Sequence, residues 1–465
     1  MSRGLKTWPL IAALAMGACA SSPAALEAGL ATRADGPLLS ADASIVSKAK
    51  VPRDWWRLYD SPELDGLVTR ALENNRSLAV AEANLAQVRA GLRETRAALL
   101  PSTTASGSAQ YARDPSLAPA DTETDIYSLG FDMAYEVDLF GRVSSSVEAA
   151  RQDTLAAENA LQATALMVAG ETARAWIDYC AGGIQLETAE ANYRLQSETL
   201  DLTRTLFDAG RAIRLDVVQA EAATRRAEAD IPSVRAARDA SLFRLARLTG
   251  QTPAEMQAAV PVCPRMPQLA SLLPAGEGAP LIARRPDVRQ AERQLASAAA
   301  RAGVATAELY PSVRLGGSIS TTSIGGNDLF SSDGVSFGIG PLISWTFPNI
   351  SAARARIAAA EAGVDGALAQ FDETFLTALE EAETALTNYA AERDRYAALE
   401  AALAASEEAA DLARTRYRVG TADFLSVLDA ERTLVETRTS LAQSEAARAS
   451  AEINVFMALG GGWAG

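Results

Sequence analysis

The side chains that could carry chemistry in this chain are mainly carboxylates. Its 465 residues include 58 Asp and Glu, three cysteines and no histidine. Without histidine, the chain lacks Ser-His-Asp and Cys-His nucleophiles, imidazole acid-base groups and His-ligated metals. It also lacks a phosphate-binding glycine loop. Carboxylates on acidic helices are usually solvated. The sequence therefore predicts a protein that is not an enzyme and uses no metal or cofactor.

The overall charge restricts the partners. The formal net charge is -15, and phosphate binding requires clustered Lys and Arg. We therefore expect no nucleic-acid partner. Aromatic residues make up only 6% of the chain, and much of the apolar content is alanine, which favours closely packed helices.

Cys19 is a candidate modification site. Arg3 and Lys6 precede an apolar stretch and two small residues, as in a secretory signal peptide. The run Met16-Gly17-Ala18-Cys19 resembles a bacterial lipobox, in which the cysteine is acylated and becomes the mature N-terminus. By the same resemblance, Ala20 indicates sorting to the outer membrane. The alternative is an ordinary cleaved signal followed by an incidental cysteine.

The other two cysteines, Cys180 and Cys263, match neither a disulfide framework nor a metal motif. Cys180 lies in a helical pattern, which predicts a small apolar packing residue whose replacement by alanine leaves function intact. The sequence leaves open whether the two cysteines pair.

These residues belong to a chain that repeats itself at an offset of 210. The offset relates Ala81, Glu82 and Leu85 to Ala291, Glu292 and Leu295, and Pro101-Ser102 to Pro311-Ser312. It also relates Gly210 to Gly420, Leu215 to Leu425, Ala220-Glu221 to Ala430-Glu431, and Gly250 to Gly460. The period exceeds the roughly 20 to 50 residues of a solenoid unit, so we predict two copies of one architecture.

Each copy contains two expected strands. Apolar and polar residues alternate strictly over 127–139, longer than the 4 to 8 residues typical of soluble strands and sufficient for a tilted membrane strand of about 9 to 11 residues. Acidic residues in this run would face an aqueous lumen. The alternative is a long strand of a soluble sandwich. We predict two hairpins, with strands at about 102–113, 126–139, 312–321 and 335–347.

A long helix follows each hairpin. Residues 143–208 contain no proline and would span about 99 Å at 1.5 Å per residue. Heptad positions such as Leu186, Leu200 and Phe207 predict coiled-coil packing. Gly210 and Gly420 can end the long helices in the left-handed conformation, and shorter helices return over about 215–248 and 424–457. Helices at 63–99 and 286–308 would complete the pairing with each long helix.

The predicted domains follow from this reading. They are a signal peptide at 1–18, a lipid-anchored segment at 19–62, a first repeat at 63–250, a linker at 251–284 and a second repeat at 285–462. Four strands cannot close a barrel, and open sheet edges are not viable in lipid. We therefore expect several copies of the chain to form one membrane barrel that continues into a helical tube.

Several segments together resemble the TolC-like outer-membrane efflux proteins, in the NodT-type lipoprotein branch. They are Trp55-Trp56 with Leu64-Asp65, residues 135–142 (YEVDLFGR), residues 284–288 (RRPDV), Gly340-Pro341, residues 423–432 (DFLSVLDAER) and residues 458–463 (ALGGGW). The resemblance covers essentially the whole mature chain. It implies a homotrimer with a 12-stranded barrel and a 12-helix periplasmic tunnel, which docks on a periplasmic adaptor and an inner-membrane pump.

The resemblance also implies that the periplasmic helix tips are the functional site. Gly210, Leu215, Gly420 and Leu425 mark the turns that would receive the adaptor. Carboxylates and apolar residues near the same turns would close the aperture, which makes Asp423, Phe424 and Asp216 the gate candidates. The alternative for Asp423 is an N-cap of the returning helix.

The sequence thus predicts a mainly helical outer-membrane exit duct that passively conducts small toxic compounds, drugs or metals. The alternative is a non-conducting, structural coiled-coil lipoprotein of the outer membrane. The strands favour the duct, because a pure scaffold needs no acidic lumen face.

Overall fold

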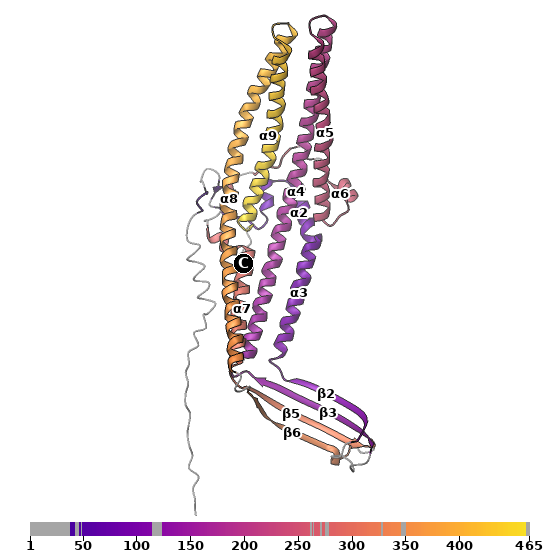
Figure 1. The fold of residues 1–465 in the computed structure, drawn as a ribbon, viewed down its shortest axis with the longest axis vertical. Coiled ribbons are helices and arrows are strands. Elements are labelled where there is room, and N and C mark those ends of the chain that lie inside the picture. The colour runs from indigo at the N-terminus through magenta and orange to yellow at the C-terminus, as the bar shows by residue number, and fades with distance from the viewer. Residues whose placement is uncertain are drawn as a thin grey trace, which may run out of the picture.

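Two very long helices run through the molecule. The computed structural model describes residues 38–41, 46–47, 49–113, 123–260, 263, 265–269, 272–274, 279–326, 329–345 and 350–461. Helix α4 (Arg142–Asp208) has 67 residues and α8 (Ile350–Arg418) has 69, so each spans about 100 Å. Both reach from the sheet to the opposite end (Figure 1). Within the described residues, no helix combines the length and apolarity needed to cross a membrane.

Two shorter helices lie along each long helix, one nearer the tip and one nearer the sheet. Helices α5 (Arg214–Leu248) and α9 (Phe424–Ala458) return from the tips, while α3 (Arg76–Ala97) and α7 (Pro286–Ala307) lie nearer the sheet (Figure 1). The predicted stacking of two short helices along one long helix is confirmed. Of the predicted heptad positions, Leu186 and Leu200 are buried, whereas Phe207 is 38% exposed.

The prediction of one helix over residues 63–99 is wrong. The chain forms α2 (Pro62–Asn74) and α3, which are separated by an extended residue, Asn75. Its side-chain oxygen accepts hydrogen bonds from the backbone N–H groups of Ser77 (2.9 Å) and Leu78 (3.2 Å). Its amide nitrogen donates to the carbonyl of Leu248, the last residue of α5, at 2.9 Å. Asn75 therefore caps α3 and joins it to the end of α5.

The second half contains the same joint with a different residue. Arg285 precedes α7 and donates a 2.8 Å hydrogen bond to the carbonyl of Ala458, the last residue of α9. Arg285 and Ala458 lie 210 residues after Asn75 and Leu248. The Arg285 guanidinium also pairs with Glu381 of α8 at 2.7 Å. The Arg-Arg-Pro-Asp run thus anchors the joint between α7, α8 and α9.

One four-stranded antiparallel sheet ends the molecule, in the order β2-β3-β5-β6. The strands are β2 (Ser102–Ala112), β3 (Thr124–Val137), β5 (Ser312–Ile324) and β6 (Val335–Ser344), with a short η3 (Ser332–Gly334) before β6. The four predicted strands form, with shifted ends. Strand β3 stops before Asp138 because that side chain accepts hydrogen bonds from the N–H groups of Val143 (2.9 Å) and Ser144 (2.8 Å) and so caps α4. The predicted end of β6 at 346–347 lies outside the described residues.

The two faces of the sheet differ in polarity. Phe131 lies opposite Ile319, which lies opposite Phe337, so one apolar row crosses three strands. These side chains are 48%, 52% and 83% exposed. The neighbouring row, on the other face, is Thr104, Asp132, Ser318 and Gly338. The predicted alternation is therefore confirmed, and it leaves a large apolar surface uncovered in the single chain.

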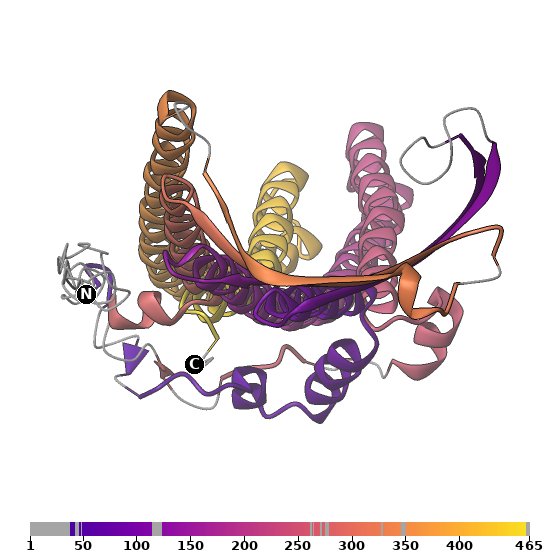
Figure 2. The ribbon, with the colours of Figure 1, turned by 90° about the horizontal axis from the view of Figure 1, so that it is seen from below.

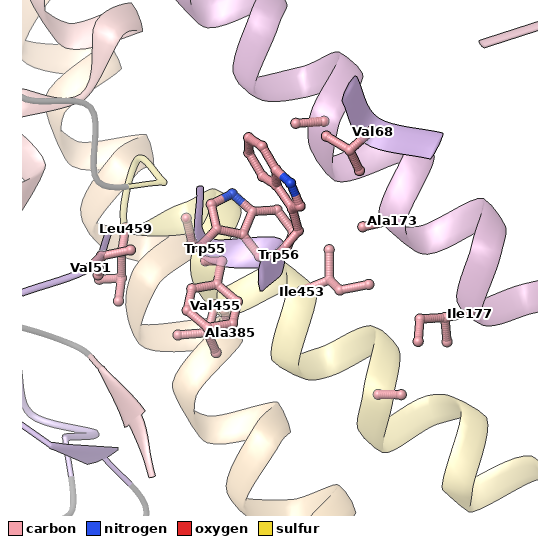
Figure 3. Close-up of a cluster of buried hydrophobic side chains, with 14 of the residues drawn as sticks. Val51, Trp55, Trp56, Val68, Ala173, Ile177, Ala385, Ile453, Val455 and Leu459 are labelled. Carbon is pink, nitrogen blue, oxygen red and sulfur yellow. The ribbon is translucent and has the colours of Figure 1, made fainter. Parts of the chain in front are cut away.

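The main core lies where the Trp55-Trp56 segment packs against α4, α8 and α9 (Figure 3). This region includes β1 (Val46–Ser47), η1 (Trp55–Tyr59), α6 (Pro253–Ala259), β4 (Leu273–Pro274) and η2 (Ala279–Arg284), and β1 pairs with β4. Trp55 is fully buried and stacks on Phe456, with ring centroids 4.8 Å apart. Trp56 donates to Asp65 at 3.0 Å, which explains the paired Trp-Trp and Leu-Asp motifs. Viewed from the sheet end, α2 lies on the convex side of the curved sheet (Figure 2).

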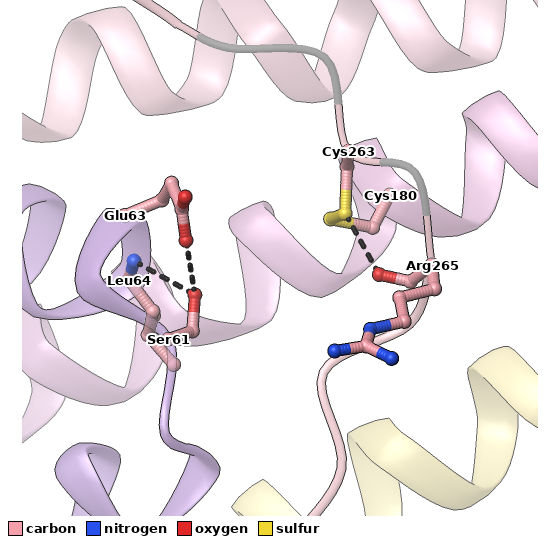
Figure 4. Close-up of a disulfide and its surroundings, with 6 residues drawn as sticks. All are labelled: Ser61, Glu63, Leu64, Cys180, Cys263 and Arg265. Carbon is pink, nitrogen blue, oxygen red and sulfur yellow. Dashed lines mark hydrogen bonds between the residues drawn. A yellow bond between two sulfur atoms is a disulfide. The ribbon is translucent and has the colours of Figure 1, made fainter.

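A disulfide joins Cys180 of α4 to Cys263 of the segment between the halves, with Cα atoms 5.2 Å apart (Figure 4). Cys180 is fully buried in the core, as expected for a packing residue, and its pairing with Cys263 answers the question that the sequence left open. The two cysteines lie 83 residues apart, so their spacing alone did not indicate the pairing. The bond fixes the linker against the middle of α4.

The disulfide gives a local prediction. In Cys263→Ser, we expect trypsin to cleave after the nearby Arg265 several-fold faster than in wild type, because proteolysis follows local opening. N-terminal sequencing of the fragments identifies the cut. Cys180→Ser should match Cys263→Ser, and the double variant should add nothing. Equal cleavage rates for oxidised wild type and Cys263→Ser would contradict the tethering role.

Candidate functional site at the helix tips

The two ends farthest from the sheet are helix-turn-helix turns of the same construction. Gly210 and Gly420 have φ values of +72° and +82°, which glycine adopts without steric cost. In the first turn, the N–H of Arg211 donates to the carbonyl of Leu206 at 2.8 Å; in the second, Thr421 donates to Arg416 at 2.9 Å. This pattern closes both long helices with a Schellman motif, so the predicted turn glycines are confirmed as helix ends.

The residues that start the returning helices differ between the turns. Asp423 is the N-cap of α9, and its carboxylate accepts from the N–H of Ser426 at 3.0 Å. The Ser426 hydroxyl donates to the same carboxylate. In the first turn, Asp216 instead accepts from the N–H of Ile213 at 3.1 Å. At the 210 offset, Ile213 and Asp216 correspond to Asp423 and Ser426. The capping carboxylate is therefore the N-cap residue itself in α9 and lies three residues after the N-cap in α5.

The cap also affects the charge of Asp423. Hydrogen bonds from the Ser426 hydroxyl and N–H hold the pKa of Asp423 below its ordinary value. The side chain is exposed. Asp423 is therefore an N-cap and, at neutral pH, an exposed negative charge beside the turn, so the two roles considered for it are compatible.

Phe424 lies inside the tip. It is 3% exposed and packs in one apolar cluster with Tyr417, whose ring centroid is 5.7 Å away. The cluster draws residues from both hairpins: Leu200, Leu206, Val217, Ala220, Tyr417, Phe424 and Val427. In the single chain, Phe424 thus holds the α4–α5 and α8–α9 hairpins together.

Leu215 and Leu425 lie on the surface of the tips. They are 58% and 59% exposed and occupy equivalent positions in the two returning helices. Ile213 and Val419, at 62% and 63% exposed, extend this apolar surface. Exposed apolar residues on both tips are a feature of protein-binding surfaces.

Two contacts between the hairpins were not predicted from the sequence. The guanidinium of Arg211 lies 3.5 Å from the carbonyl of Arg418, so the first turn reaches the end of α8. Further down, Glu431 of α9 is fully buried between hairpins. Its Oε1 accepts a 2.5 Å hydrogen bond from the Thr199 hydroxyl of α4 and lies 3.0 Å from Nε of Arg414 on α8.

Burial gives Glu431 unusual properties. Desolvation raises its pKa, while Thr199 and Arg414 oppose the shift. Its Oε2 has no hydrogen-bond partner among the described residues. The equivalent residue at the 210 offset, Glu221, is not buried, so the burial of Glu431 could not be inferred from the repeat. The DFLSVLDAER run contains four charged residues, so charge alone did not single out Glu431.

Comparisons with known proteins agree with this geometry. The family model described as outer membrane efflux protein matches twice, over residues 67–251 and 280–461. The antibiotic efflux pump outer membrane protein ArpC of Pseudomonas putida is 31% identical over 463 residues, covering 97% of this chain and 94% of ArpC. The outer membrane protein OprJ of Pseudomonas aeruginosa is 31% identical, covering 98% of this chain and 95% of OprJ.

Solved structures show the same fold. The outer-membrane channel OprN superposes with a TM-score of 0.86 at 33% identity and covers 92% of this chain and 97% of OprN. VceC of Vibrio cholerae superposes with a TM-score of 0.81 at 27% identity, with 87% and 98% covered. Among the relatives found by sequence, the cation efflux system protein CusC of Escherichia coli is 27% identical over 409 residues, covering 88% of each chain.

Proposed function

This chain belongs to the outer membrane efflux protein family, whose members are transport conduits rather than enzymes, and on that premise we propose that it is the exit duct of a tripartite efflux system. It would receive small toxic compounds, drugs or metals from a periplasmic adaptor and an inner-membrane pump and pass them outward. Relatives named for antibiotic efflux and for cation efflux support a duct that does not itself select the cargo.

The observation that carries the proposal is the sheet, whose two edge strands pair with no further strand among the described residues. Strands β2 and β6 form the edges, and the sheet leads directly into helices of about 100 Å. Lipid does not tolerate open edges, so β2 of one chain must pair with β6 of the next. We propose a homotrimer, with twelve strands in the barrel and twelve helices in the periplasmic tunnel, built from two internal repeats per chain.

The test is conductance of the purified full-length protein in planar lipid bilayers, together with its mass in detergent. We expect the mass of three chains and discrete single-channel steps. A folded monomer would contradict the trimer. Trimers that insert without conducting in any state would favour the alternative, a structural lipoprotein without a pore. The sheet has one apolar face and one polar face, which favours a barrel with a lipid-facing exterior and an aqueous pore.

We also propose that the tips bind the adaptor and that the aperture of the tunnel closes near the same turns. Gly210 and Gly420 shape the turns, while Leu215 and Leu425 supply equivalent exposed apolar contacts. Asp423 and Asp216 place one carboxylate at each turn. Among the gate candidates, Asp423 carries most of the proposal, because Phe424 is buried in the tip cluster.

Acylation of Cys19 is a further part of the proposal. Cys19 and the signal segment lie outside the described residues, so the support for acylation is the lipobox-like sequence Met16-Gly17-Ala18-Cys19. Mass spectrometry of the mature protein should find an acylated N-terminal cysteine. Cys19→Ser should weaken membrane anchoring more than conductance, since the strands insert independently. An unmodified N-terminus that begins elsewhere would contradict acylation.

A further inference from the structure

A cavity of about 370 Å³ lies between the two hairpins below the tips. One stripe of each of three helices lines it, within residues 185–196 of α4, 223–234 of α5 and 428–443 of α9. The stripe on α9 extends about 22 Å along the helix. The volume falls within the range of about 300 to 1,000 Å³ that small-molecule sites occupy.

A buried amide lies in the wall of this cavity. Asn192 of α4 lines it and is 5% exposed, and its side-chain Oδ1 has no hydrogen-bond partner among the described residues. A buried acceptor without a donor is costly, and native structures rarely leave one unmade. The accessible surface of Oδ1 is below 1 Å², so the amide must turn toward the cavity before a ligand N–H or O–H can donate to it.

The charged groups at the cavity favour an anion. Arg226 of α5 and Arg432 of α9 both line it, and both are exposed. In the described part of the chain neither forms an ion pair, whereas the adjacent Arg225 pairs with Glu228 at 2.8 Å. Asp230 is the one carboxylate in the lining, so the net charge there is positive. Guanidinium groups bind carboxylates and sulfonates through charge-assisted hydrogen bonds.

We propose that this cavity binds a small anionic amphiphile. Its apolar body would lie against Ala223, Ala227 and Val435. Its carboxylate or sulfonate would lie between Arg226 and Arg432, and an N–H or O–H would donate to Asn192 Oδ1 once that amide turns toward the cavity. Because α9 belongs to one hairpin and α4 and α5 to the other, an occupant contacts both hairpins at once. The site is thus placed to set their relative position, and binding itself does not depend on the proposed duct function.

The probe for the test is 1-anilinonaphthalene-8-sulfonate, which combines an aromatic body, a sulfonate and one N–H. Its fluorescence is titrated against the full-length protein in lipid nanodiscs, with empty nanodiscs subtracted. We expect one saturable site per chain. Arg226→Gln, Arg432→Gln and Asn192→Leu should each weaken binding about tenfold, the loss expected for one hydrogen bond to a charged or buried group. Ala227→Leu should abolish it by filling the cavity.

Arg225→Gln is the matched control, since it removes the same charge from the adjacent position, which does not line the cavity. It should bind the probe as wild type does. Circular dichroism confirms that each variant keeps its helices, and Ala227→Leu tests the site without altering charge. Unchanged affinity in Ala227→Leu and Asn192→Leu would overturn the proposal, as would equal weakening by Arg225→Gln and Arg226→Gln. Conductance is measured separately, so a failed binding test leaves the duct function standing.

Discussion

Single channels of Asp423→Asn should show a several-fold weaker preference for cations than wild type, together with larger closed-state leakage. In the proposed trimer, three copies of Asp423 surround one axis, and a ring of carboxylates attracts cations and repels anions. The hydrogen bonds from Ser426 keep Asp423 ionised below its ordinary pKa, so wild-type preference should persist into mildly acidic solution. Reversal potentials in asymmetric salt measure the effect.

Two variants separate the charge of Asp423 from its capping role. Asparagine caps a helix about as well as aspartate, whereas alanine does not. If the charge controls the aperture, Asp423→Asn and Asp423→Ala should change selectivity equally. A change in Asp423→Ala alone would reduce the residue to a cap and move the aperture elsewhere. Ser426→Ala, which removes the hydroxyl and keeps the N–H bond, should retain cation preference.

Replacing Glu452 with glutamine should stabilise the protein at pH 8 by up to about 3 kcal/mol and leave it unchanged near pH 4. Glu452 lies on α9 in the main core and is 7% exposed. Burial raises its pKa to about 7, although Arg448 opposes the shift. The difference from the ordinary value of 4.5 sets the size of the effect, at about 1.4 kcal/mol per pH unit.

The direction of this effect follows from proton binding. Between pH 4.5 and about 7, the folded protein keeps the proton on Glu452 while the unfolded chain has lost it, so stability falls as pH rises. Thermal melts followed by circular dichroism at pH 4, 6 and 8 measure the change. Glu436→Gln, which alters an exposed carboxylate of the same helix, should reproduce the wild-type profile. A wild-type-like profile for Glu452→Gln would contradict the assignment.

The long elements were predictable because their signals are local and repeated. The proline-free run before Asp208 has a helical pattern over many residues, and the residues around Phe131 alternate as in a strand. The structure has a helix and a strand at these places. The break at Asn75 was missed because helix propensity is high on both sides. What selects the break is a hydrogen bond to Leu248, 173 residues away, which no local pattern contains.

The tips were predicted only in part for a similar reason. Gly210 and Gly420 indicated the turns, since a left-handed residue after a long helix nearly requires glycine. The burial of Phe424 and Glu431 depends on how the two hairpins pack against each other, and the copies differ there. Leu215 and Leu425 remain equivalent and exposed, whereas Glu221 and Glu431 do not share an environment.

The position of the disulfide along the chain has a consequence for folding. Both cysteines precede residue 285, where the predicted second copy begins. A chain exported from its N-terminus can therefore oxidise Cys180 and Cys263 before that copy emerges. Similar halves of one polypeptide are prone to exchange equivalent elements with each other and with neighbouring chains. The covalent bond between α4 and the connecting segment fixes the first half before the second half is available to compete with it. Oxidation during secretion would therefore reduce mispairing of the two halves during assembly.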